Sequence, residues 1–306
     1  MRRVLPFVAS VALTSTLIAA SAQLRRIQSD VNPIDSKSSL VYKTATEGTL
    51  SVDLSFPDAW RATDHRPAII LFFGGGFDSG TTNQFGGTAK YFASRGLVAA
   101  TPDYRVRRRQ QTGPEKSIED MRSAIRWIRM NAARLGIDPQ RIIAGGASSG
   151  GTGAVLAAYS SAYQPEADGE MISDRPNALL LYNPALGFGS HHGEVPPEVV
   201  KALEPVISNW EVTSGGPPAI VFFGTEDNLM ERGRAFAEQM IALGNRAELY
   251  TAEGQGHGFF QELRPIGHWH EAVIHQSDLF LASLGYLHGE PTIEHPVAEV
   301  LKKVLP

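Results

Sequence analysis

Short apolar runs alternate along this chain with segments of helical periodicity, and this alternation limits the possible folds more than any other feature. Several runs are almost continuously Val, Ile, Leu and Phe, as is typical of strands buried on both faces of a sheet. The strand-like runs cover residues 40–44, 50–55, 68–73, 97–101, 141–145, 178–182, 219–223 and 247–251. We therefore predict an α/β fold, with a mostly parallel, twisted sheet of about eight strands and helices on both faces.

Helical patterns fall between the later apolar runs. Apolar residues recur at spacings of three and four from 118 to 132, which places them on one helix face. Ser117 can cap this helix and Gly136 can end it. Further helices are predicted at about 151–159, 231–243 and 271–284. Residues 183–216 lack clear periodicity, so we expect a small insert after the sixth strand, and a short turn at Glu47-Gly48 predicts an antiparallel edge.

The N-terminus has the layout of a secretory signal peptide. Arg2 and Arg3 precede an apolar stretch that ends in Ala20-Ser21-Ala22, a small-x-small cleavage site. The alternative is an uncleaved membrane anchor, although the stretch is short for a membrane span. We expect cleavage near Ala22, export to the periplasm or the medium, and no stable membrane insertion afterwards. The expected organisation is signal peptide 1–22, exposed lead-in 23–39, a single α/β domain at 40–288 and a C-terminal tail at 289–306.

Composition excludes several classes of protein. A net charge of −4 argues against a nucleic-acid partner, which would require a basic surface. The absence of Cys excludes a disulfide framework, a Cys-ligated metal centre and a cysteine nucleophile. His191-His192 have only Glu194 as a nearby carboxylate, and a solvated loop explains them better than a metal site. We therefore expect no metal and no cofactor.

The sharpest chemical signal is Gly146-Ala147-Ser148-Ser149-Gly150, a Gly-x-Ser-x-Gly motif. It follows the apolar run at 141–145 and precedes a predicted helix. This context matters because a nucleophilic serine of this type lies on a tight turn between strand and helix. The alternative is a Gly/Ser-rich turn without chemistry. The motif predicts that Ser148 is a nucleophile at the sheet edge.

Partners for Ser148 follow in the chain order that such a triad needs, first an acid and then a histidine. Glu226 and Asp227 come directly after the strand at 219–223, and His257 comes after the next strand. In this interpretation Ser148 attacks a carbonyl, His257 accepts its proton, and one of the two carboxylates orients the histidine. A plain loop histidine is the alternative for His257.

A glycine run after the strand at 68–73 can supply donors to an oxyanion. Glycines allow backbone N–H groups to approach a ligand closely. We expect the N–H groups of Gly74, Gly75 and Ser149 to form the oxyanion hole. Phe77 and Phe259 flank the proposed centre and could form a wall of the acyl pocket, although core packing explains them nearly as well.

These motifs together resemble the α/β-hydrolase fold. More narrowly, the chain looks like secreted bacterial esterases related to the hormone-sensitive-lipase group and to acetyl and feruloyl esterases of carbohydrates. The resemblance rests on residues 74–76, Asp103-Tyr104-Arg105, Asp120, 124–129, 136–142, the Ser148 motif, Asn183-Pro184, 224–227 and 256–259. It implies that Asp227 rather than Glu226 is the triad acid. Phe73 stands where many of these esterases have a histidine that orders the glycine loop, so the sequence does not show what orders the loop here.

The resemblance implies a serine carboxylic-ester hydrolase with an acyl-Ser148 intermediate. Because the insert at 183–216 is short, we expect short, acetyl-like acyl esters, including esters of carbohydrates, and a steep fall in activity by octanoyl esters. A serine peptidase or amidase with the same triad is the first alternative. The second is a catalytically silent binding protein of the same fold. The sequence does not predict the oligomeric state.

Overall fold

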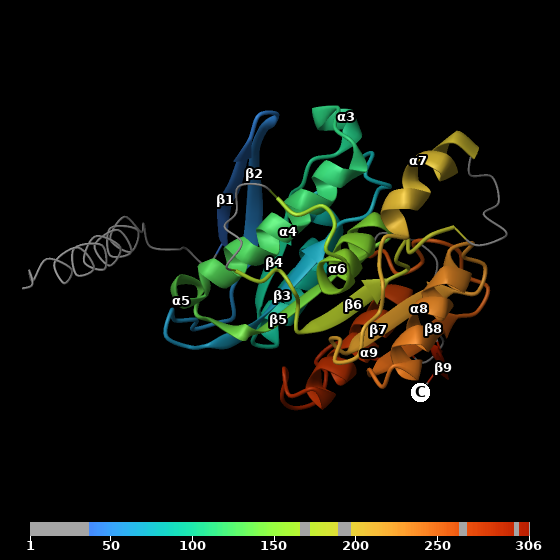
Figure 1. The fold of residues 1–306 in the computed structure, drawn as a ribbon. Helices are drawn as coiled ribbons and strands as arrows, with labels where there is room; N and C mark the ends of the chain where they lie inside the picture. The colour runs from blue at the N-terminus through green and yellow to red at the C-terminus, as the bar shows by residue number, and fades with distance from the viewer. Residues whose placement is uncertain (1–36, 166–171, 189–196, 263–267, 297–299, 306) are drawn as a thin grey trace, which may run out of the picture. The chain divides into compact units, whose positions relative to one another are not determined.

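The structure is a computed structural model that describes residues 37–165, 172–188, 197–262, 268–296 and 300–305 (Figure 1). The predicted signal peptide at 1–22 and residues 23–36 of the lead-in lie outside these residues, as do His191 and His192. The chain divides into two units, Met1–Ser38 and Ser39–Pro306, and the fold belongs to the second. Among the residues described, no helix has both the length and the hydropathy that a membrane crossing requires.

A nine-stranded sheet forms the centre of this unit, in the order β1-β2-β4-β3-β5-β6-β7-β8-β9. The strands are β1 (Lys37–Ala45), β2 (Gly48–Ser55), β3 (Arg66–Phe72), β4 (Val98–Pro102), β5 (Ile137–Ala147), β6 (Ala178–Tyr182), β7 (Ala219–Gly224), β8 (Ala247–Ala252) and β9 (Lys302–Leu305). Strands β4, β3, β5, β6, β7 and β8 pair in parallel, whereas β2 and β9 pair antiparallel at either side. The predicted α/β class is confirmed, and so is an antiparallel pairing on the β2 side.

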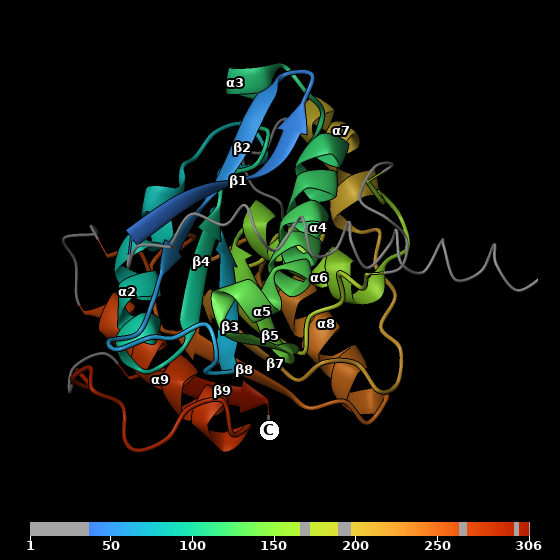
Figure 2. The ribbon, with the colours of Figure 1, turned by 90° about the vertical axis from the view of Figure 1, so that its left-hand side faces the viewer.

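Helices cover both faces of the sheet, as predicted. Figure 2 shows α2 (Gly86–Ser94) and α9 (Trp269–Ser283) on one face and α4 (Pro114–Met130), α6 (Ser149–Tyr159) and α8 (Met230–Ala242) on the other. The remaining helices are α7 (Pro197–Ile207) and the single turns η1 (Thr82–Phe85), α3 (Arg107–Gln110) and α5 (Ala132–Leu135).

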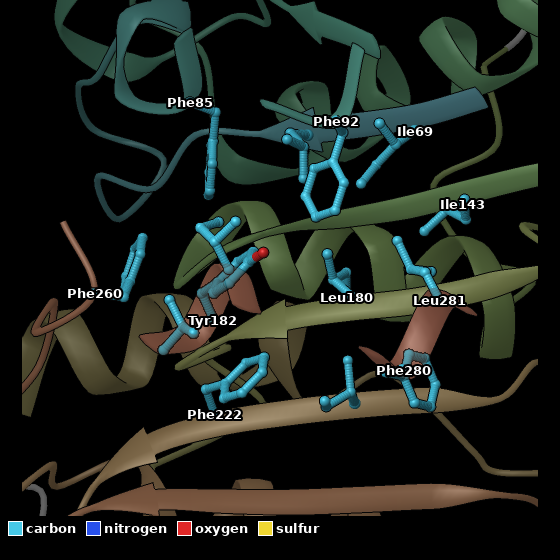
Figure 3. Packing of buried hydrophobic residues seen from close by; sticks show 14 of the residues in the cluster. Ile69, Phe85, Phe92, Ile143, Leu180, Tyr182, Phe222, Phe260, Phe280 and Leu281 are labelled. Atoms are coloured by element: carbon cyan, nitrogen blue, oxygen red, sulfur yellow. The ribbon is translucent and has the colours of Figure 1, made fainter. Parts of the chain in front are cut away.

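The core on the α2 and α9 side contains side chains from the six strands β3 to β8. Ile143 of β5, Leu180 of β6 and Phe222 of β7 are fully buried against Phe92 of α2 and Phe280 of α9 (Figure 3). Burying each such side chain stabilises the fold by about 1.5–3 kcal/mol. This packing explains why these strands are almost continuously apolar in the sequence.

The start of α4 differs from the sequence prediction, whereas Gly136 ends the helical segment as predicted. Ser117 does not cap α4, which begins at Pro114 after Gly113; the Ser117 hydroxyl is buried and donates to the Arg105 carbonyl at 2.6 Å. Proline fits the first turn of a helix because its missing N–H would have no partner there. Gly136 ends the helical segment with a φ of 65°, as predicted, although a break at Asn131 separates α4 from α5.

The sequence did not predict β9, α2 and α7, nor the single turns η1 and α3. Strand β9 lies in the segment that was expected to be a C-terminal tail. Its Lys302 and Lys303 interrupt the apolar pattern of a strand, although charged residues are typical of edge strands. Helix α2 begins with two glycines, which lowers its helix propensity. Helix α7 lies inside the insert, where its apolar residues were not recognised as one helix face.

The parallel register brings the candidate residues to one edge of the sheet. Phe72, the last residue of β3, pairs with Gly146, and Ala147, the last residue of β5, pairs with Tyr182. Gly224, at the end of β7, pairs with Ala252 at the end of β8. The loops that follow these strands therefore share the carboxyl edge, where α/β sheets bind ligands.

Candidate active site

Ser148 lies on the sharp turn between β5 and α6. Its φ of 49° and ψ of −118° are a strained backbone conformation, of the kind that functional sites retain. Its N–H donates to the Tyr182 carbonyl at 3.1 Å. A Cβ at Gly150 would lie 2.2 Å from the Phe72 carbonyl oxygen, so only glycine allows the turn to pack this closely against β3. The Gly-x-Ser-x-Gly motif thus holds the predicted strand–turn–helix geometry.

Asp227 and His257 form the predicted pair. The His257 Nδ1 atom lies 2.8 Å from Asp227 Oδ2, and the Asp227 side chain is completely buried whereas that of His257 is 41% exposed. The Leu229 N–H donates to Asp227 Oδ1 at 2.9 Å, which fixes the carboxylate. Glu226 is exposed, and its N–H donates to the Gln255 carbonyl. The geometry therefore favours Asp227 over Glu226.

Asn183, the residue after β6, packs against His257. Its Nδ2 atom lies 3.2 Å from both ring nitrogens of His257. The Asn183 backbone has a φ of 37°, and its N–H donates to the Phe222 carbonyl at 2.7 Å. The buried Asn183 side chain therefore restricts the position of the imidazole ring.

The glycine loop after β3 differs from the prediction at Gly74. The Gly74 N–H donates to Oε1 of Gln84 at 2.6 Å, so it is not available to an oxyanion. Among the residues described, no acceptor is assigned to the N–H groups of Gly75 and Gly76. The N–H of Ser149 belongs to the first turn of α6, where backbone donors have no partner within the helix. The candidate donors are therefore Gly75, Gly76 and Ser149.

Phe73 and Tyr104 hold the start of this loop. Their rings stack with centroids 3.9 Å apart and planes 11° apart. The Tyr104 hydroxyl donates to the Phe73 carbonyl at 2.6 Å. Burial raises the pKa of Tyr104, so the phenol stays protonated and remains a donor. An aromatic stack and a buried hydrogen bond thus order the loop at the position where the sequence offered no histidine.

Ser148 and His257 line the same cavity, which has a volume of about 270 Å³. Its wall is of mixed polarity, and the side chains of Gln84, Asn183 and Gln261 contribute polar groups to it. The aromatic residue in this wall is Phe260. Phe259, predicted as a pocket wall, is instead buried and packs edge-on against Trp269 with ring centroids 6.0 Å apart.

A larger apolar groove of about 460 Å³ begins at Gly76, which lines both spaces. Phe77, predicted as a wall of the acyl pocket, does not line the cavity that holds Ser148 and His257 but lines this groove. Its other walls come from the start of α4, including Pro114, and from Ala202 and Leu203 of α7. The groove therefore meets the catalytic cavity at Gly76, and no described residue of the His257 loop lines it.

Comparisons with known proteins agree with this geometry. The BD-FAE family model matches residues 52–178, and the family described as alpha/beta hydrolase fold matches residues 193–261. The propionate-bound structure of Thermogutta terrifontis esterase 2 is 37% identical, with a TM-score of 0.77, and the match covers 83% of this chain and 97% of that one. The chain belongs to the α/β-hydrolase esterases.

A curated relative supports the same assignment. The carboxylesterase NlhH of Mycobacterium tuberculosis is 29% identical over 228 residues, a match that covers 64% of this chain and 67% of that protein. This α/β-hydrolase is thus a carboxylic-ester hydrolase. The butyrate-bound structure of the Thermogutta esterase is 38% identical, with a TM-score of 0.76, and the match covers 83% of this chain and 96% of that one.

Sequence reasoning did not assign Gln84, Phe260, Asn183 or Gln261 to this esterase's cavity. Gln84 lies on η1, which has no helical periodicity, so its contact with Gly74 left no pattern in the sequence. Phe260 is adjacent to Phe259, and only the turn geometry decides which of the two faces the cavity. Asn183 stands directly after a buried strand, and that position was the available signal.

Proposed function

We propose that this esterase hydrolyses small carboxylic esters by two-step acyl transfer through an acyl-Ser148 intermediate. His257 accepts the Ser148 proton during attack and returns it to the leaving alcohol, and Asp227 stabilises the imidazolium that forms. The N–H groups of Gly75, Gly76 and Ser149 stabilise the oxyanion. The single observation that carries this proposal is the 2.8 Å contact between Asp227 and His257 beside a cavity that Ser148 also lines.

The proposed substrates are short-chain acyl esters, including acetyl esters of carbohydrates. Two observations support this proposal: the catalytic cavity is small and has amide side chains in its wall, and a related esterase binds propionate and butyrate. Such amide groups suit a hydroxylated alcohol such as a sugar, because buried polar groups need hydrogen-bond partners. The layout of residues 1–22 supports the further proposal that the enzyme is exported.

The apolar groove favours a second class of substrate. The leaving alcohol must lie beside His257, which protonates it, so the acyl group points toward the side without the His257 loop. The groove that begins at Gly76 lies on that side, and its volume falls within the range of about 300–1,000 Å³ that ligand pockets occupy. Longer aliphatic or aromatic acyl groups are therefore the second candidate.

Hydrolysis of a panel of esters tests the proposal. The panel contains nitrophenyl acetate, butyrate, octanoate and palmitate, methyl ferulate and acetylated xylan, with a nitroanilide as the amide. We expect turnover of the short esters and little turnover of the nitroanilide. Nitroanilide turnover that matches the acetate would favour an amidase. Absence of turnover on every compound would favour a catalytically silent binding protein.

A further inference from the structure

We infer that Gln84 is a positioning residue of the oxyanion hole, which acts by holding the Gly74 N–H and thereby fixing Gly75 and Gly76 relative to Ser148. This inference rests on the proposed function, because it assigns a role within the same site. It starts from the hydrogen bond between the Gly74 N–H and Gln84 Oε1. The distance of 2.6 Å is short for an N–H···O hydrogen bond.

Gly74 lies directly against the turn that carries Ser148. A Cβ at Gly74 would lie 2.9 Å from the Ala147 carbonyl oxygen and 3.2 Å from Ser148 Cβ. The position of the Gly74 backbone therefore sets the spacing between the loop and Ser148. The two proposed donors follow at the next two residues, so a shift at Gly74 moves both of them.

The rest of the loop is anchored on either side of this point. Before it, Tyr104 donates to the Phe73 carbonyl. After it, the Gly75 carbonyl accepts from the N–H groups of Asp78 and Ser79 at 3.0 and 3.2 Å. Between these anchors, the Gln84 side chain accepts the hydrogen bond from the Gly74 N–H.

Gln84 itself stands on a rigid support. It lies on η1 next to Phe85, which is 1% exposed and whose ring lies 5.6 Å from the ring of Tyr182. The ring of Phe260 lies 6.1 Å from that of Phe85 on the cavity side. A residue anchored in the core in this way can hold a loop without moving with it, which preorganised catalysis requires.

The contact also decides which donors are free. A backbone N–H requires an acceptor, so Oε1 of Gln84 faces Gly74. With that bond made, the Gly74 N–H cannot compete with Gly75 and Gly76 for the substrate oxygen. Loss of this hydrogen bond would free the Gly74 N–H, which is not positioned for the oxyanion, and would leave the N–H groups of Gly75 and Gly76 less firmly positioned. Removal of one oxyanion donor costs roughly 10²–10³-fold in kcat, and loss of the bond that positions two donors is expected to cost roughly 10–100-fold.

The test compares Gln84→Met with Gln239→Met, its matched control. Gln239 is exposed on α8, outside the catalytic cavity, and both changes keep the size of the side chain while removing its amide. We expect Gln84→Met to lower kcat on nitrophenyl acetate by about 10–100-fold, with KM changed less than about 3-fold, because the defect lies in the transition state. Gln239→Met should retain kcat within about 3-fold, and both variants should unfold at the wild-type temperature.

A spectroscopic readout separates positioning from stability. The Gly74 amide proton should resonate downfield in the wild type and move upfield in Gln84→Met. Gln84→Glu retains an acceptor of equal reach, so its Gly74 resonance should stay downfield while its charge opposes the oxyanion and lowers kcat.

Several results would overturn the inference: unchanged kcat in Gln84→Met, an equal loss in Gln239→Met, a loss confined to KM, or a Gly74 resonance that does not move. If Gln84→Met fails to fold, the kcat of Gln84→Glu and the position of the wild-type Gly74 resonance still test the inference. A wild type that hydrolyses no ester would contradict the proposed function instead, while the Gly74 resonance would still test the contact.

Discussion

The Nδ1 atom of His257 lies 2.8 Å from Oδ2 of Asp227, whose side chain is completely buried. The second carboxylate oxygen accepts the Leu229 N–H, so both oxygens have a donor. A carboxylate fixed in this way holds the Nδ1 proton of the imidazole and leaves Nε2 as the proton acceptor. This pair lies 30 residues apart in the chain, and the ends of β7 and β8 bring it together.

Asp227→Asn should fold and lose activity on the order of 10⁴-fold in kcat, because the amide favours the wrong tautomer of His257 and does not stabilise the imidazolium. Glu226→Gln should retain most activity, since Glu226 is exposed and does not contact the ring. Steady-state kinetics on nitrophenyl acetate measures both variants. The opposite ranking would assign the triad acid to Glu226.

Asp120→Asn should lower the free energy of unfolding by about 3–5 kcal/mol, because it removes the fully buried carboxylate of this cluster and leaves Arg105 only its partly exposed partners Glu47 and Glu119. The fully buried Asp120 carboxylate lies 2.7 Å from Nε of Arg105 and 2.9 Å from Nζ of Lys43. Urea denaturation measures the change. The control is Asp58→Asn at an exposed position, which should leave the midpoint unchanged. Equal midpoints for wild type and Asp120→Asn would contradict this assignment.

The value of kcat/KM should peak at acetyl to butyryl esters and fall steeply by octanoyl, because each methylene adds only about 0.8 kcal/mol and only where it is covered. The nitrophenyl ester series measures this profile. A profile that rises to octanoate, or strong turnover of methyl ferulate, would contradict the short-acyl proposal and favour the groove as the acyl site.

Helix α7 offers a matched pair of variants for the same question. Ala202 lines the groove, whereas Lys201 is exposed on the same helix. If the enzyme accepts only short acyl groups, Ala202→Trp should behave as Lys201→Trp across the whole ester series. If Ala202→Trp alone removes activity on octanoate or ferulate, the acyl group extends into the groove.

The sequence predicted the architecture well where burial sets the pattern. Strands such as β6 and β7 are buried on both faces, so their apolar runs were visible directly. Strand β9 was not predicted because it is an edge strand that carries lysines. Helix α2 was not predicted because it begins with two glycines. Such elements depend on tertiary pairing more than on local propensity.

The site could be predicted where chemistry requires fixed residue types in chain order. Ser148, Asp227 and His257 each follow a recognisable strand, and the fold brings Asp227 against His257 beside the cavity that Ser148 lines. Gly74 and Phe259 were placed wrongly because a one-residue shift along a turn changes which N–H or side chain faces the cavity. No sequence pattern encodes that shift, since loop geometry depends on contacts such as the one from Gln84.

Ser148→Ala should fold and lose roughly 10⁴-fold or more in ester hydrolysis, whereas Ser149→Ala should be far milder because only the Ser149 N–H takes part. Circular dichroism controls for folding in both variants. Wild-type turnover in Ser148→Ala would contradict the mechanism.

The most direct test of the account is covalent labelling with a fluorophosphonate, followed by intact-mass measurement and peptide mapping. The account predicts one adduct per chain, on the peptide that contains Ser148, with labelling retained in Ser149→Ala and lost in Ser148→Ala. A wild-type chain that stays unlabelled, or an adduct that persists in Ser148→Ala, would contradict the assignment of Ser148 as the nucleophile.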